Sequence, residues 1–215
     1  LVVGTSGRNP ITFDNWNNSK ILAYWKYDDA TKLGKDSHSW LGRLNNIRTA
    51  LQGQQGDRRL RLGIAGGEWK KMMADATART RFASEVKKII EQYEFDGVDF
   101  DFEWPANASE YNNYSATVIQ MRATLGKYVY FTASLHPVSF KISPEAIDAL
   151  DFISYQCYGP AVMRFPYEQF VKDGEAAVAY GIPKNKLVMG VPFYGSTGSL
   201  IAAYCDFVND GLANT

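Results

Sequence analysis

Short apolar segments alternate along the chain with longer segments in which apolar residues recur every three or four positions. The short segments predict strands and the longer ones predict helices, because strand side chains alternate between two faces whereas a helix turns once in about 3.6 residues. The clearest helix is expected over Thr80–Tyr93, where Phe82, Val86 and Ile89 share one side. The other expected helices cover Ser109–Leu125, Tyr167–Tyr180 and Ser199–Asn209.

Seven strands are expected along the chain. Strands that alternate with helices of this length form βαβ units, and such units build a parallel sheet. The fold class is therefore α/β, and two architectures remain open: an open doubly wound sheet, or a (β/α)8 barrel of which seven of the eight strands are recognisable. The expected strands are Leu1–Gly4, Lys20–Trp25, Leu60–Ala65, Phe95–Trp104, Tyr128–Leu135, Phe152–Tyr158 and Leu187–Phe193.

Length and composition favour one domain over residues 1–215, since no linker interrupts the pattern. The 23 Lys and Arg balance the 23 Asp and Glu, and no apolar run approaches the ~18 residues that span a bilayer, so neither a nucleic-acid nor a membrane partner is expected. Two cysteines and two histidines exclude a disulfide scaffold and a zinc finger. The chain opens on Leu1 rather than Met, which predicts a processed product or an excised piece.

The segment Phe95–Pro105 carries a row of acidic residues. Asp99, Asp101 and Glu103 alternate there with one valine and two phenylalanines, so a strand would place the three acids on one face. Both faces of a helix-covered parallel sheet are normally apolar. Because burying an unpaired carboxylate costs several kcal/mol, a row of three predicts a function.

That function is expected to involve a proton. Acids about 6.5–7 Å apart along a strand raise one another's pKa, so part of the row should hold a proton near neutral pH, as a general acid must. Glu103 directly precedes Trp104 and Pro105, which end the expected strand, and active sites of barrels and open α/β sheets lie at the carboxyl ends of strands. A solvated edge strand and a Mg²⁺ or Ca²⁺ site are the two alternatives.

The pattern Asp96-x-x-Asp99-x-Asp101-x-Glu103, followed by Trp-Pro, resembles the signature of the family 18 glycoside hydrolases, the chitinases and their relatives. The resemblance extends over about Leu1–Gly195 and implies a (β/α)8 barrel. Three further stretches resemble that family in its own order: Gly66-Gly67 after the third strand, Phe152–Tyr158 as the sixth strand with its tyrosine, and Gly190–Gly195 as the seventh.

The resemblance implies a role for each residue of the row. Glu103 would protonate the glycosidic oxygen while the substrate's own 2-acetamido carbonyl attacks C1, since this family is an exception to the two-carboxylate scheme. Asp101 would orient the acetamido N–H, Asp99 would pair with Asp101, and Asp96 would support that pair from below. Tyr158 would donate a hydrogen bond to the acetamido oxygen. No cofactor and no metal are implied.

Five further side chains are expected to contact the sugar. They lie at or just after the carboxyl ends of expected strands or point into the expected barrel, although a structural role is an open alternative, above all for the histidine and the tryptophans. These residues are Trp69, Trp104, His136, Gln156 and Tyr194.

The chain departs from the family pattern in three places. Gly159 stands where an Asp commonly follows the tyrosine, and Glu68 separates Gly66-Gly67 from Trp69. Only twenty residues follow Gly195, and they hold no Trp to end an eighth strand. We therefore expect the barrel to be incomplete at its C-terminal side, with an open edge closed by a partner chain or a further segment.

The expected function is hydrolysis of β-1,4-linked N-acetylglucosamine polymers, with chitin or its oligosaccharides as the ligand. A chitinase-like lectin without turnover, an enzyme that cleaves N-glycan cores and a metal-dependent hydrolase are the alternatives. Three Asn-x-Ser triplets, at Asn17, Asn107 and Asn113, agree with a secreted protein.

Overall fold

The computed structural model describes residues 2–3, 44–45, 48–49, 52, 59–65, 69–159, 166–192, 194–197 and 200–203. Its strands are β1 (Val2–Val3), β2 (Arg61–Ala65), β3 (Gly97–Asp101), β4 (Tyr130–Leu135), β5 (Phe152–Gln156), β6 (Leu187–Gly190), β7 (Tyr194–Thr197) and β8 (Leu200–Ala203). Its named helices are α4 (Trp69–Ala74), α5 (Ala76–Gln92), α6 (Ala108–Leu125), α7 (Pro144–Ala149), α8 (Tyr167–Tyr180) and the short 3₁₀ helix η2 (Lys184–Lys186).

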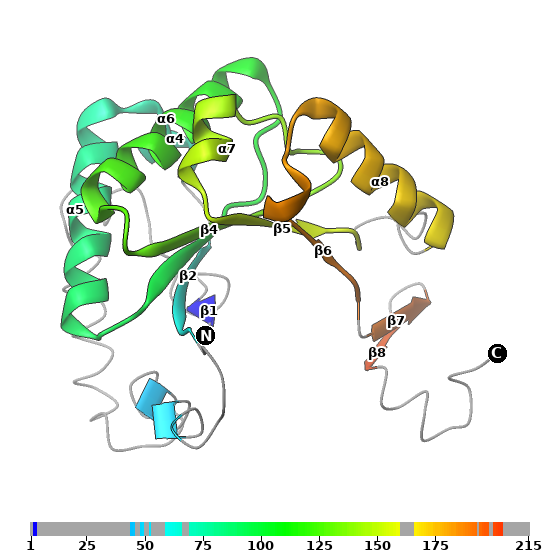
Figure 1. Cartoon of the computed structure of the whole chain (residues 1–215), viewed down its shortest axis with the longest axis horizontal. Helices are drawn as coiled ribbons and strands as arrows, with labels where there is room; N and C mark the ends of the chain where they lie inside the picture. The colour runs from blue at the N-terminus through cyan, green and yellow to red at the C-terminus, as the bar shows by residue number, and fades with distance from the viewer. Residues whose placement is uncertain are drawn as a thin grey trace.

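Strands β1 to β6 form one parallel sheet in which the spatial order follows the chain order. The helices α4 to α8 all lie on one side of this sheet (Figure 1). A doubly wound sheet reverses its strand order at a switch point and carries helices on both faces. Sequential order with helices on one side is the winding of a (β/α)8 barrel, so the described residues resolve the choice between the two architectures.

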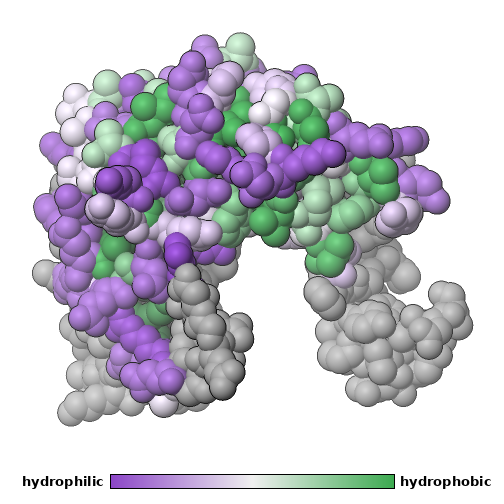
Figure 2. Space-filling model, in the orientation of Figure 1, coloured by the Kyte–Doolittle hydropathy of each residue, from purple (hydrophilic) through white to green (hydrophobic). Residues whose placement is uncertain are grey.

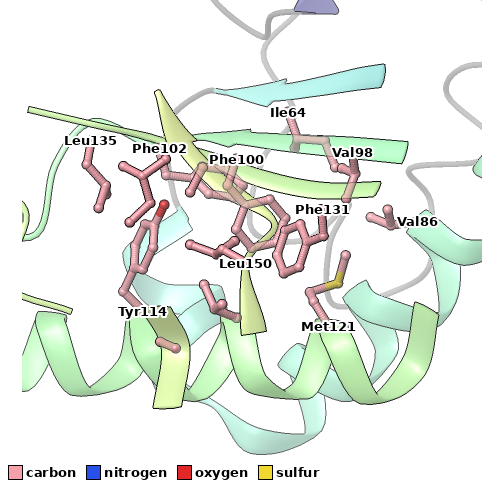
Figure 3. Close-up of a cluster of buried hydrophobic side chains, with 14 of the residues drawn as sticks. Ile64, Val86, Val98, Phe100, Phe102, Tyr114, Met121, Phe131, Leu135 and Leu150 are labelled. Atoms are coloured by element: carbon pink, nitrogen blue, oxygen red, sulfur yellow. The ribbon is translucent and has the colours of Figure 1, made fainter. Parts of the chain in front are cut away.

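The helix-covered side of the sheet holds the core. Phe100 lies at its centre, with ring centroids 4.8 Å from Phe131 and 5.2 Å from Phe102. Figure 3 shows these rings between the strands and α6, which contributes Tyr114 and Met121. All five side chains are fully buried. Burial of each contributes roughly 1.5–3 kcal/mol, which holds the helices on this face and leaves the other face for the acids.

Side chains that precede the helices fix where they begin. Asp75, Asn107 and Ser143 each accept a hydrogen bond from a backbone N–H of the first turn, over 2.9, 3.0 and 3.2 Å. Such caps satisfy donors that have no partner within the helix. Asn107 and Ser143 also end the loops that follow β3 and β4, so Asn107 marks where the acid-bearing loop after β3 stops.

Gly97 allows β3 and β4 to approach each other. It pairs with Tyr130 in the sheet, and a Cβ at this position would overlap the Tyr130 carbonyl. Only glycine tolerates so close a backbone approach. The close packing of β3 against β4 therefore requires a glycine at position 97, two residues before Asp99, the first acid of the row.

Two expectations about the last described elements need correction. The expected helix Ser199–Asn209 is wrong over Leu200–Ala203, which is strand β8 and pairs antiparallel with β7. A short apolar run does not distinguish helix from strand by its periodicity, and the neighbouring strand decides. The expected strand Leu187–Phe193 ends at Gly190, and the expected strand Lys20–Trp25 lies outside the described residues.

Apolar surface remains uncovered where α8 meets β6 (Figure 2). A groove of about 540 Å³ lies there, lined by Phe170, Val178 and Met189 among others. Val188 on β6 is 49% exposed. Among the described strands, β6 is one end of the six-stranded sheet. None of the described helices combines the length and the apolar character needed to cross a membrane.

Candidate active site

The acid row lies on the face of the sheet opposite the helices. Val98, Phe100 and Phe102 are fully buried in the core, whereas Asp99 and Asp101, which alternate with them on β3, are only half-buried. Glu103 lies two residues beyond the end of β3 and is exposed. The predicted alternation is confirmed, but the row is not buried throughout, because it rises from the sheet toward solvent at Glu103.

Asp99 is held by donors from both neighbouring strands. The Ser134 hydroxyl of β4 donates to its Oδ2 over 3.0 Å, and the Thr132 hydroxyl of β4 donates to its Oδ1. Arg61 of β2 donates to the same Oδ1 over 3.2 Å and forms an ion pair with it. Both oxygens of Asp99 are thus occupied, and the carboxylate is fixed at the base of the row.

Asp101 lies between two other acids and has a raised pKa. Burial raises the pKa of Asp101 to about 6, helped by the charges of Glu103 and then of Asp99. The Gln156 amide nitrogen of β5 donates to Asp101 Oδ1 over 3.3 Å and opposes this rise in part. Asp101 therefore holds its proton below about pH 6, a more acidic range than the near-neutral one that the sequence predicts for the row.

Asp96 supports the row through the backbone. Its Oδ2 accepts a hydrogen bond from the Leu60 N–H over 2.6 Å, and its own N–H donates to the Leu60 carbonyl over 2.9 Å. These two bonds tie the segment before β2 to the segment before β3. They precede the β2–β3 pairing in which Arg61 lies opposite Gly97 and Gly63 lies opposite Asp99.

Tyr158 follows β5 by two residues and is half-buried. Its neighbours Ile153, Tyr155 and Cys157 are buried on the helix side, so Tyr158 shares the opposite side with Gln156, as the alternation predicts. The ring lies beside Gly190 of β6, where an added Cβ would stand 3.3 Å from Tyr158 Cε1. The glycine of the next strand therefore leaves room for this ring.

His136 is buried, and both ring nitrogens are engaged by the backbone. Nδ1 accepts from the Val138 N–H over 3.2 Å, which leaves Nε2 to donate to the carbonyls of Tyr158, at 3.0 Å, and Gly159, at 2.6 Å. Trp104 packs on the histidine with ring centroids 4.7 Å apart. His136 thus connects Trp104, in the loop after β3, to the backbone at Tyr158. A direct sugar contact by its ring stays a prediction.

Trp69 differs from the expectation of a sugar-stacking ring. It is 3% exposed and lies in the core, with ring centroids 5.9 Å from Phe102 and 6.1 Å from Tyr114. Trp69 is the first residue of α4, and the helix turns it toward the helix-covered side of the sheet. Tyr194 lies on β7, but its side chain is outside the described part of the structure, so its role stays a prediction.

Three residues of the site went unassigned in the sequence. Thr132 and Ser134 alternate on β4 and were recognisable only as polar residues of one phase, while Arg61 is a charged residue inside an otherwise apolar strand. All three become part of the site through the register of β2, β3 and β4, which pairs Gly63 with Asp99 and Asp99 with Thr132. Among the described residues, no group of three His, Cys, Asp or Glu side chains could hold a metal ion.

Comparison with known proteins agrees with the family resemblance that the sequence motifs carry. Residues 9–206 match the model of the glycosyl hydrolases family 18. The chain is 26% identical over 189 residues to "Probable chitinase 2" of Drosophila melanogaster, covering 70% of this chain and 37% of that protein. It is 25% identical over 167 residues to "Class V chitinase" of Arabidopsis thaliana, covering 62% and 44%. The chain thus spans less than half the length of these two relatives.

Solved structures share the fold. A family 18 chitinase from Flavobacterium johnsoniae superimposes with a TM-score of 0.67 at 22% identity, over 78% of this chain and 60% of its own. A chitinase-like agglutinin from Robinia pseudoacacia gives a TM-score of 0.64 at 20% identity, over 78% and 66%. The strand order typical of a (β/α)8 barrel, the acid row and the match over residues 9–206 all indicate the same family. The chain belongs to the glycosyl hydrolases family 18.

Proposed function

We propose that this chain carries the acid, the positioning carboxylate and the tyrosine of a retaining, substrate-assisted glycosidase that acts on β-1,4-linked N-acetylglucosamine polymers. The observation that carries the proposal is the graded acid row. Asp99 is fixed by three donors, Asp101 has a pKa of about 6, and Glu103 is exposed at the end of the row. A substrate can therefore reach Glu103 from solvent.

In the proposed reaction Glu103 gives its proton to the glycosidic oxygen as the bond to C1 breaks. The carbonyl oxygen of the substrate's 2-acetamido group attacks C1 and forms a cyclic oxazolinium ion, with no covalent bond to the protein. Asp101 accepts a hydrogen bond from the acetamido N–H and stabilises the developing positive charge, while the Tyr158 hydroxyl donates to the acetamido oxygen. Water then attacks C1 from the face that the leaving group vacated and gives a proton to the Glu103 carboxylate, while the bond between C1 and the acetamido oxygen breaks, which restores the acetamido group and retains the configuration.

The described six-stranded sheet is open at β6. Because β6 is an end strand of the described sheet and exposes Val188, we extend the proposal to a further segment or a partner chain that pairs with β6 and completes the barrel. The triplet Asn107-Ala108-Ser109 supports secretion as a further part of the proposal, since Asn107 is exposed at the start of α6.

A lectin is the second candidate. The similarity to a protein described as a chitinase-like agglutinin favours it, whereas the complete row ending in Glu103 favours the enzyme. One purified sample separates the two when chito-oligosaccharide binding and reducing-end release are measured side by side. Binding with turnover supports the hydrolase, whereas binding at micromolar concentrations with no reducing ends above the uncatalysed background supports the lectin.

A further inference from the structure

Arg61 occupies the base of the barrel-side face of the sheet. It is the first residue of β2 and pairs with Gly97 of β3. Gly63, the next residue of β2 on the same face, pairs with Asp99. Neither glycine has a side chain, so no side chain at these two positions stands between Arg61 and Asp99. The arginine side chain crosses β3 and reaches β4 and β5.

The contacts of Arg61 confirm this path. Its Nη1 donates to Asp99 Oδ1 on β3 over 3.2 Å and to the Thr132 hydroxyl on β4. The guanidinium carbon stands 4.9 Å from the centroid of the Phe152 ring on β5. The side chain is 29% exposed. A planar, permanently charged group with several donors suits this combination of an ion pair, a hydroxyl and an aromatic face.

Arg61 and the two β4 hydroxyls leave Asp99 little freedom. Its Oδ1 accepts from both Arg61 and Thr132, and its Oδ2 accepts from Ser134. To turn toward Asp101 and share a proton with it, the Asp99 carboxylate would have to give up these donors. Leaving a half-buried guanidinium and two hydroxyls without an acceptor is costly.

We propose that Arg61 is a positioning residue of the acid row, which fixes the Asp99 carboxylate as an anion at its base so that proton exchange is confined to Asp101 and Glu103. The inference rests on the proposed function for its catalytic meaning, but the placement of the proton can be measured without turnover. No other cation contacts the row among the described ion pairs and hydrogen bonds.

Within the described part of the chain, further groups act on Asp99 and Asp101 from β4, β5 and α6. From β4 they are the neutral hydroxyls of Thr132 and Ser134, and from β5 the neutral amide of Gln156. Tyr114 of α6 lies on the other side of the sheet, in the core, where burial and then the charges of Asp99 and Asp101 raise the pKa of its phenol, which stays neutral. Among these groups only Arg61 supplies a positive charge.

The test follows the carboxyl carbons of ¹³C-labelled aspartate by NMR between pH 3 and 9 in wild type, Arg61→Met and Arg61→Lys. Loss of the charge should raise the pH at which the row takes up its first proton by about one unit, with Asp99 and Asp101 now titrating together. Lys keeps the charge and should restore most of the wild-type curve. Arg122→Met is the matched control, since Arg122 forms a comparable ion pair with Asp151 at 2.7 Å but stands away from the row.

Unchanged Asp99 and Asp101 curves in Arg61→Met, or a curve in Arg61→Lys that matches Arg61→Met, would overturn the proposal. If Arg61→Met does not fold, Arg61→Gln, which keeps amide donors and removes the charge, is read by the same criteria. A wild-type protein that cuts no oligosaccharide would contradict the proposed function alone, because the NMR curves do not depend on turnover. If turnover is present, the acid limb of its pH profile should move with the NMR midpoint.

Discussion

The Gln156 amide nitrogen donates to Asp101 Oδ1 over 3.3 Å and links the middle acid of β3 to β5. The same strand leads, two residues later, into Tyr158. One strand thus carries both a group that adjusts the middle acid and the tyrosine proposed to hold the substrate's acetamido group. Changes at Gln156 and Asp101 should therefore be visible in titration and in stability before any substrate is added.

Gln156→Leu removes a donor to the Asp101 carboxylate and keeps the volume of the side chain. Because that hydrogen bond lowers the pKa of Asp101, its loss should move the Asp101 carboxyl signal to a higher titration midpoint. Gln169→Leu, which removes a similar 2.8 Å bond to Asp173 on α8, is the control and should leave the Asp101 midpoint in place. A midpoint that falls in Gln156→Leu would contradict the assigned donor.

Asp101→Asn should stabilise the protein at high pH. The pKa of Asp101 rises from 3.8 to about 6 on folding, so ionisation of this carboxyl opposes folding. Its unfavourable effect is absent below about pH 4 and complete above about pH 6. We expect Asp101→Asn to raise the free energy of unfolding by about 1 kcal/mol at pH 8, less than the full shift implies because water screens the partly exposed group, and by little at pH 4.

Urea unfolding at both pH values measures this difference. Asp148→Asn, at an exposed position on α7, serves as the control and should show no such pH dependence. A stabilisation of Asp101→Asn that is equal at pH 4 and pH 8 would show that ionisation of Asp101 is not its cause.

Gly97→Ala should be among the most destabilising single-methyl changes in the chain. A Cβ at Gly97 would overlap the Tyr130 carbonyl of the paired strand, so β3 and β4 would have to separate, at a cost of about 3 kcal/mol. Gly174→Ala adds the same methyl group 3.1 Å from the flexible end of Met189 and gains helix propensity in α8. Thermal unfolding should rank the two variants clearly, and equal midpoints would contradict the close strand approach.

The metal-dependent alternative predicts a different response to chelation. Asp99 is already paired with Arg61 and two hydroxyls, so the row has its own cation and we expect hydrolysis to be unchanged within about twofold after EDTA treatment and gel filtration. Activity that is lost to EDTA and restored by Mg²⁺ or Ca²⁺ would replace the substrate-assisted mechanism.

Much of the fold was predictable because local pattern and packing agree. The helix expected over Tyr167–Tyr180 has these bounds in the structure, and the alternation in β3 correctly separates the core phenylalanines from the acids. The strand β8 was mistaken for a helix because its pairing with β7 outweighs the periodicity of a four-residue apolar run.

The site was predictable only where a residue's chemistry follows from its own strand. Trp69 was placed in the cleft because it follows an expected strand, whereas it begins α4 and is buried in the core. Arg61 was missed because its role depends on the registers of β2, β3 and β4, which set which side chains meet across strands. Such cross-strand relationships are not encoded in any single segment.

Glu103→Gln tests most directly whether Glu103 supplies the proton for glycosidic cleavage, since the amide keeps the shape of the side chain and lacks the acid. We expect reducing-end release from a chito-oligosaccharide to fall by about 100-fold or more while oligosaccharide binding persists. Glu91→Gln, an exposed change on α5, should match wild type in both measurements. Hydrolysis by Glu103→Gln within a few-fold of wild type would contradict the account.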